Sequence, residues 1–255
     1  MTHNQDKSSM LSQGIFIFVY LAVLTALEYF VAATFKSVAV LVVVALIKAA
    51  LVVYYYMHIY KLNADHEGDH DSYEYKTGTN RLGLWLFLVS DLFVFGGLMV
   101  MRMNLLGLTR PNLNQLLGLG VTAILLISSF FMNRGETLIK SGDRKGFLNN
   151  TLITFLLGLG FLIGVIFVEW RLAAHEGLTP SSGAAGAVFY MMTGMHAFHV
   201  FTGLIFLAIV WFNGRHGLYD EKHFPVEAAA VYWHFVDVVW IFFYPALYLI
   251  GTALL

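Results

Sequence analysis

The sequence predicts an all-α integral membrane protein with seven transmembrane helices. Of its 255 residues, 58% are hydrophobic and only 12% are charged. Soluble domains have about 45–50% apolar and about 25% charged residues, so the composition argues against a water-soluble protein. The 15 basic and 16 acidic residues leave no cationic excess for nucleic acid, and the lack of cysteine excludes disulfides and thiolate metal sites.

Seven apolar stretches are long enough to cross a bilayer, which takes about 20 residues. In order, they are residues 11–34, 37–61, 81–103, 113–133, 147–172, 185–213 and 226–254. Polar turns with proline or glycine separate the later stretches, as is typical of loops. Pro245 lies within the last span, where we expect it to kink or widen the helix. The first span is too long for the core of a signal peptide, so we expect it to be retained.

The lysine and arginine residues predict the orientation. Ten fall on the side of the N-terminus and the even-numbered turns, and four fall on the other side. Because cytoplasmic loops carry the excess of positive charge, we expect the N-terminus in the cytoplasm and the C-terminus outside. The expected location is a bacterial cytoplasmic (inner) membrane, crossed several times.

Residues 63–80 are polar and acidic, without an apolar period. We interpret them as a linker between a two-span unit, residues 1–62, and a five-span unit, residues 81–255. An ordinary surface loop is the alternative. His66 and His70, beside two aspartates, could bind a metal, but a solvated acidic loop is the simpler interpretation.

A few ionisable side chains lie within the spans of the five-span unit. A charge at the centre of a membrane helix costs at least about 2.5–3.5 kcal/mol, so such groups are expected to be paired or to face protein or water. At about 1.5 Å per residue, Asp91, His199 and Asp237 lie at similar depth, with His196 one turn further out and His234 one turn further in. We expect these five to form one polar layer between helices. A proton path or lipid-headgroup site, and a redox or metal centre, are alternatives.

These residues suit neither a haem nor a di-metal centre. His196 and His199 are too close in sequence for two stacked haems, and His234 has no second partner on its helix. Di-iron bundles use paired Glu-x-x-His helices, a pattern that is not repeated here. Glu169 lies near the outer interface, too far from the others. We therefore expect this chain to bind no metal and no cofactor.

The two-span unit contains an acidic and a basic residue inside its helices. Glu28 and Lys48 differ in depth by roughly 7–8 Å, a gap that a lysine side chain can bridge. We expect a buried ion pair that clamps this hairpin.

Two motifs in the last spans are distinctive. Residues 232–240 read Tyr-Trp-His-Phe-Val-Asp-Val-Val-Trp, and residues 194–200 read Gly-Met-His-Ala-Phe-His-Val. Together they resemble subunit III of haem–copper oxidases, the terminal oxidases of respiratory chains, over residues 81–255. The family usually has Ser-Glu in the third span, where this chain has Ser90-Asp91. The carbodiimide labelling known for that glutamate therefore cannot be assumed for this aspartate.

The two-span unit resembles a different oxidase subunit. Leu24-Thr-Ala-Leu-Glu28, Leu46-Ile-Lys48-Ala-Ala-Leu-Val-Val-Tyr54 and Tyr56-Met-His-Ile are similar to the small bacterial subunit IV. We interpret the chain as a fusion of subunits IV and III. The alternative is that these spans are the first two helices of a seven-helix subunit III.

The resemblance implies a subunit without redox centres in a proton-pumping oxidase that reduces O2 to water, with haems and copper in subunits I and II. It also implies packing mainly against subunit I, contact with subunit II and other subunits, structural phospholipid in a cleft, and support of proton uptake. Glu169, Arg171 and Tyr232 are the candidates for lipid contact. We favour cytochrome c over quinol as electron donor to the complex. A transporter with Asp91 and Asp237 as coupling acids is the alternative of another class, but the internal repeats it predicts are not seen.

Overall fold

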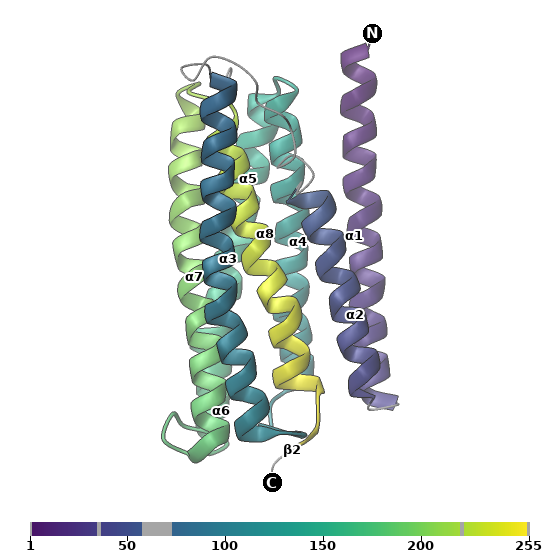
Figure 1. Cartoon of the computed structure of the whole chain (residues 1–255), viewed down its shortest axis with the longest axis vertical. Coiled ribbons are helices and arrows are strands. Elements are labelled where there is room, and N and C mark those ends of the chain that lie inside the picture. Colours follow the sequence, from purple (N-terminus) through teal and green to yellow (C-terminus); the bar gives the residue numbers. More distant parts are fainter. Residues whose placement is uncertain (1, 35–36, 58–72, 220–221, 254–255) are drawn as a thin grey trace.

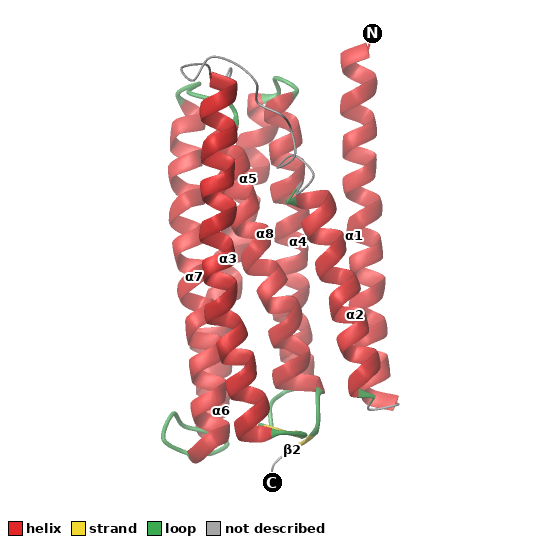
Figure 2. Ribbon diagram, viewed as in Figure 1, coloured by secondary structure: helices red, strands yellow, loops and turns green. Residues whose placement is uncertain are grey.

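The computed structural model describes residues 2–34, 37–57, 73–219 and 222–253. Long helices run side by side along the longest axis of the molecule (Figure 1), and loops lie at the two ends (Figure 2). Within the described residues, seven helical segments are long and apolar enough to cross a membrane, which confirms the predicted fold class. They are Leu11–Thr34, Val38–Tyr56, Tyr75–Leu106, Gln115–Lys140, Arg144–His175, Gly183–Arg215 and Phe224–Leu249.

The seven spans are built from α-helices, three of which continue into short π-helical turns. The first four spans use α1 (Thr2–Thr34), α2 (Val38–Leu51) with turn η1 (Val52–Tyr56), α3 (Tyr73–Leu106) and α4 (Gln115–Lys140). The others use α5 (Arg144–Ile163) with turn η3 (Gly164–Glu169) and α6 (Trp170–His175), then α7 (Gly183–Arg215), and α8 (Phe224–Tyr244) with turn η4 (Pro245–Leu249). The last turn begins at Pro245, which has no N–H to donate to the α-helical ladder, so the helix widens where the sequence predicted a kink or widening.

The third span begins earlier than expected. The sequence placed residues 73–80 in a polar linker, whereas α3 already begins at Tyr73. A helix satisfies its own backbone hydrogen bonds, so it can extend beyond the hydrocarbon into the polar interface. Residues 63–72 of the expected linker, with both of its histidines, lie outside the described residues.

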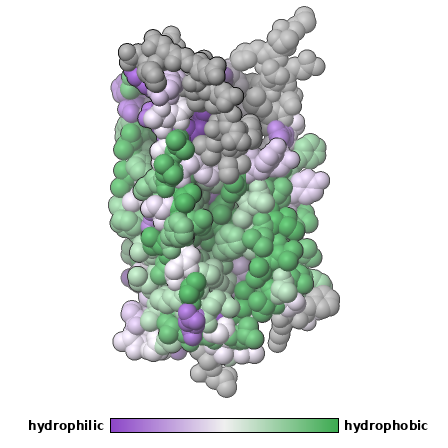
Figure 3. All heavy atoms as spheres, viewed as in Figure 1, coloured by the Kyte–Doolittle hydropathy of each residue, from purple (hydrophilic) through white to green (hydrophobic). Residues whose placement is uncertain are grey.

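The last span forms the centre of the bundle. In the most apolar window of that span 89% of the residues are buried, compared with 17% for the span of α3. The helix α8 packs against α2, α3, α4 and α7, and it lies between the hairpin α1–α2 and helix α3 in Figure 1. The hairpin joins the bundle through α1 on α4 and α2 on α8. Hydrophobic side chains cover most of the face shown in Figure 3 between its two ends, as expected for a surface in contact with lipid or a partner subunit.

A buried arginine links the C-terminal end of α3 to the C-terminal end of the last span. Arg102 is fully buried and donates hydrogen bonds to the carbonyl groups of Gly107, Thr109, Ala246 and Ile250 at 2.5–3.0 Å. The short strands β1 (Thr109–Arg110) and β2 (Thr252–Ala253) pair in parallel at the same place. These bonds fix the end of α8 against the end of α3.

Candidate functional site

Asp91 on α3 and His199 on α7 face each other. Asp91 Oδ2 lies 3.6 Å from His199 Nε2. His199 Nδ1 lies 2.8 Å from the carbonyl oxygen of Met195, which can only accept, so Nδ1 carries a hydrogen. Nε2 then points at the carboxylate, and the contact is favourable only if a proton lies on one of the two groups that face each other. The two side chains therefore form a close acid–imidazole pair between α3 and α7.

The surroundings of this pair are aromatic. The ring of Phe95 meets the His199 ring edge to face, with centroids 4.6 Å apart. The Tyr232 hydroxyl lies 2.6 Å from Thr202 Oγ1 and 3.4 Å from the His199 carbonyl oxygen. The side chains of Asp91 and His199 are 16% and 12% exposed, so the pair lies at the edge of the protein rather than in its core.

His234 and Asp237 lie on another face of α8. His234 Nδ1 is 3.3 Å from Ser129 Oγ of α4, and Ser129 also hydrogen-bonds Asp237. The ring of Tyr56, from turn η1, lies 5.0 Å from the His234 ring. Lys48 interacts electrostatically with Asp237. This group therefore joins α8 to both α4 and the hairpin α1–α2.

The hairpin contains the ion pair that the sequence predicted. Lys48 Nζ lies 2.6 Å from Glu28 Oε2, and the two side chains are 1% and 0% exposed. Removing one partner of such a pair leaves an uncompensated buried charge. The role of the pair as a clamp on the hairpin stays a prediction.

His196 belongs to a third place in the bundle. Its Nε2 lies 3.0 Å from the carbonyl oxygen of Val236 on α8, and its ring packs against those of Phe161 and Trp240. Since a carbonyl oxygen only accepts, Nε2 carries the hydrogen. The side chain is fully buried and joins α7 to α8.

The five residues expected in one polar layer thus lie in three separate groups. Asp91 pairs with His199, His234 and Asp237 share Ser129, and His196 binds a backbone carbonyl. The depth estimate gave each residue's height along its helix. It did not give the direction in which the side chain points, and α8 separates two of the groups.

The three lipid-contact candidates differ in exposure. Arg171 is exposed. Glu169 is only 3% exposed, and its carboxylate accepts a hydrogen bond from the Tyr248 hydroxyl. Turn η3 thus directs the carboxylate into the protein, towards turn η4, and the expected contact of Glu169 with lipid stays a prediction. Tyr232 is buried, but its ring lines an apolar groove.

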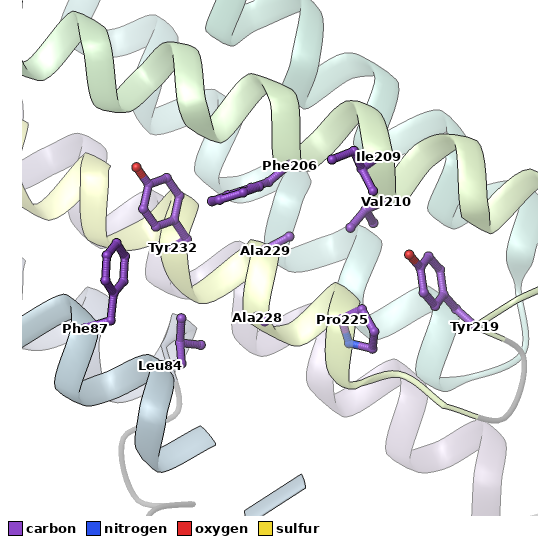
Figure 4. Close-up of a pocket in the computed structure, with 10 residues that line it drawn as sticks. All are labelled: Leu84, Phe87, Phe206, Ile209, Val210, Tyr219, Pro225, Ala228, Ala229 and Tyr232. Atoms are coloured by element: carbon purple, nitrogen blue, oxygen red, sulfur yellow. The ribbon is translucent and has the colours of Figure 1, made fainter. Parts of the chain in front are cut away.

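That groove lies between α3, α7 and α8 and has a volume of about 340 Å³ (Figure 4). Aromatic and aliphatic side chains form its wall. The lining residues are Leu84, Phe87, Phe206, Ile209, Val210, Tyr219, Pro225, Ala228, Ala229 and Tyr232. Such a wall suits a hydrocarbon chain.

Sequence reasoning missed the hydroxyl groups of α4 that face α8. Trp233 Nε1 donates to Ser128 Oγ at 3.1 Å, and Trp240 Nε1 donates to Thr122 Oγ1 at 2.9 Å. It also missed the ion pair between Arg81 Nε and Glu227 Oε1, at 2.8 Å. Small hydroxyl residues within an apolar span are typical of close helix packing and could have signalled this interface.

Within the part of the chain that the structure describes, no three His, Asp or Glu side chains form a group that could hold a metal ion. The ionisable residues instead pair with one another, with hydroxyl groups or with backbone carbonyls.

Seven apolar helices joined by buried polar contacts define a multi-pass membrane protein. Its family follows from comparison with known proteins. The model of the family described as cytochrome c oxidase subunit III matches residues 3–252, and the chain belongs to that family.

Curated relatives include subunits of two kinds of oxidase. The chain is 35% identical over 201 residues to cytochrome c oxidase subunit 3 of Thermostichus vulcanus, a match that covers 73% of this chain and 92% of the relative. It is 32% identical over 206 residues to quinol oxidase subunit 3 of Bacillus subtilis, covering 75% of this chain and 98% of the relative. Both matches show similarity to subunit III of respiratory oxidases.

Proposed function

We propose that this chain is a non-redox accessory subunit of a proton-pumping cytochrome c oxidase that reduces O2 to water. The observation that supports it most directly is the family match over residues 3–252. In this proposal the haems and copper lie in subunits I and II, and the chain binds none of them. Membership of the matched family explains the acidic residues within the membrane better than a transporter function does.

The Asp91–His199 pair supports a role in proton uptake. In this proposal the pair shares one proton at the edge of the protein, 12–16% exposed, where a partner subunit or lipid would cover it. Moving this proton between the carboxylate and the imidazole leaves the net charge of the pair unchanged, which limits the cost of a charge in hydrocarbon. The pair also braces α3 against α7. Both properties fit a subunit that sustains proton uptake by subunit I.

Phospholipid is the ligand that we propose for the apolar surfaces. Oxidase subunit III is expected to hold lipid in a cleft beside the first two helices, and the groove between α3, α7 and α8 offers a further apolar wall. Tyr232 lines this groove, and Arg171 is exposed where a headgroup could bind. The main protein partner in this proposal is subunit I, with subunit II and other subunits in the same complex.

Cytochrome c is the electron donor that we propose for the complex, with quinol as the alternative. Relatives of both kinds match the chain at similar identity, 35% and 32%. The proposed location is a bacterial cytoplasmic membrane, with the N-terminus in the cytoplasm as the distribution of lysine and arginine predicts.

A fusion of subunit IV with subunit III is our proposal for the two-span unit. Matches that cover 92% and 98% of two relatives leave about a quarter of this chain unmatched, as an added unit would. The family match over residues 3–252, in contrast, favours the alternative that both helices belong to subunit III itself.

Purification through a tag on this chain, in mild detergent, tests the function. We expect haem-bearing chains to co-purify and to give the optical spectrum of a haem–copper oxidase. Reduced cytochrome c and a quinol, supplied separately, identify the donor by oxygen consumption. The isolated chain provides the control, since stoichiometric iron or copper bound to it alone would contradict the accessory role.

A further inference from the structure

A polar row lies along one face of the most buried span. Asp237, Tyr244 and Tyr248 are spaced by seven and four residues, which places their side chains on the same side of the helix. Their Cα atoms span about 16 Å along the axis. We call these three residues the α8 polar stripe.

Ionisable side chains from other elements face this stripe. Lys48 interacts electrostatically with Asp237, and Glu28, its ion-pair partner, interacts with Tyr244. Tyr244 and Tyr248 have ring centroids 5.6 Å apart. The Tyr248 hydroxyl donates to Glu169, so the row continues from the hairpin α1–α2 to turn η3.

Four polar atoms in this row have no hydrogen-bond partner among the described residues. They are Asp237 Oδ2, Glu28 Oε1, the Tyr244 hydroxyl and Glu169 Oε2. The four residues that carry these atoms are only 0–3% exposed. A buried polar atom left unsatisfied costs about 1–3 kcal/mol, so four in one row indicate a polar ligand shared between them.

The charges of the row indicate a resident proton. Three carboxyl groups lie along the row, those of Glu28, Asp237 and Glu169, and one lysine, Lys48, interacts with the first two. Other ionisable neighbours are His234, which contacts Ser129 and Tyr56, and the phenols of Tyr56 and Tyr29, which interact with Asp237 and Tyr244. An uncompensated charge in the interior of a membrane protein is costly, so at least one proton is held on a carboxyl group or on His234.

The local backbone is adapted to bring these side chains together. Glu169 ends the π-helical turn η3, and Tyr248 lies in the π-helical turn η4. A Cβ atom at Gly118 on α4 would lie 2.6 Å from the ring of Tyr248, so only glycine leaves room for this tyrosine. π-Helical turns often occur at functional sites, and here two of them direct one hydrogen bond.

We propose that the interface between the hairpin α1–α2 and the α8 polar stripe is an internal site that binds a short row of water molecules and holds one exchangeable proton between Asp237 and Glu169. Water can donate and accept, so it satisfies carboxylate and hydroxyl oxygens alike. Each proton transfer along the row breaks one O–H bond and forms one on the next oxygen. The site is independent of the oxidase role, because it rests only on contacts within this chain.

Hydroxyl-radical labelling of the full chain in nanodiscs tests for the water. Bound water generates radicals inside the protein, so we expect Tyr244 and Tyr248 to be oxidised faster than Trp240. Trp240 is the control, because it is 1% exposed and its N–H is satisfied by Thr122. Labelling of both tyrosines at or below the rate of Trp240 overturns the proposal.

Infrared spectroscopy after transfer to D2O tests for the proton. We expect the infrared band of a buried, protonated carboxyl group, which shifts rapidly as its hydrogen exchanges for deuterium. In Tyr244→Phe, which removes the central hydroxyl of the row, we expect the band to be lost or its shift to be slower. Tyr20→Phe is the matched control, because Tyr20 is 61% exposed on α1, and it should leave the band unchanged. Equal exchange in the two variants overturns the proposal, and Glu169→Gln assigns the band.

Discussion

Two acid–base pairs, Glu28–Lys48 and Asp91–His199, lie in very different surroundings. Glu28 and Lys48 lie in the interior, 0–1% exposed, and their neighbours belong to the most buried span. Asp91 and His199 lie on the edge of the bundle, 12–16% exposed, on the spans of α3 and α7, whose most apolar windows are 17% and 44% buried. An acid–base pair is therefore enclosed by the protein in one region and remains accessible to lipid, protons or a partner in the other.

The interior pair is expected to show the largest effect on stability. We expect Lys48→Met to lower the free energy of unfolding by about 3–5 kcal/mol, because Glu28 then stays buried without its partner. Thermal unfolding in nanodiscs measures the loss. The double variant Glu28→Gln/Lys48→Met is the control and should recover most of it. A single variant that assembles as stably as the native chain would show that the pair is not needed.

The edge pair is expected to affect function more than stability. We expect Asp91→Ala to leave the haem and copper content of the purified oxidase unchanged but to shorten its catalytic lifetime or lower proton pumping, since the acid–imidazole pair is lost. The number of turnovers before inactivation measures the catalytic lifetime, and the number of protons released per O2 measures pumping. Asp91→Glu keeps a carboxylate and should behave like the native protein. Unchanged pumping and inactivation kinetics in Asp91→Ala would contradict the role.

The groove beside the edge pair predicts a smaller change. We expect Ala229→Phe to fill space between α3, α7 and α8 and to reduce the phospholipid that co-purifies with the chain, because an acyl chain no longer fits. Lipid mass spectrometry of the purified complex measures it. Leu156→Phe, which adds bulk on an exposed face of α5, should change nothing. Equal lipid content in both variants would count against lipid in this groove.

A single neutral hydrogen bond in the interior should have the smallest effect. We expect Thr122→Val, which nearly keeps the shape of the side chain, to cost about 1–3 kcal/mol in unfolding free energy, because the buried Trp240 N–H loses its hydrogen-bond partner. Thermal unfolding of the variant measures it. A loss of unfolding free energy as large as that of Lys48→Met would contradict the expectation that breaking a buried charged pair costs more than breaking a neutral hydrogen bond.

The sequence predicted the helices well and the side-chain contacts only in part. Long apolar stretches predicted seven spans. A depth difference that a lysine side chain can bridge predicted the contact of Glu28 with Lys48, because two helices of a hairpin must lie side by side. The early start of α3 at Tyr73 escaped prediction, since polar residues at a helix end have no apolar period. The contact between Asp237 and the hairpin also escaped, because it joins distant spans.

By itself, the sequence determined that the chain spans a membrane, how many times it does so and which family motifs it carries, because hydrocarbon enforces long apolar helices whatever their neighbours are. Only the tertiary structure decided which polar side chains meet. It placed Asp91 with His199 and turned Asp237 towards Ser129 and Lys48, and it directed Glu169 inward to Tyr248. Height along a helix follows from counting residues, whereas the direction of a side chain depends on the rotation of each helix, which packing between helices sets.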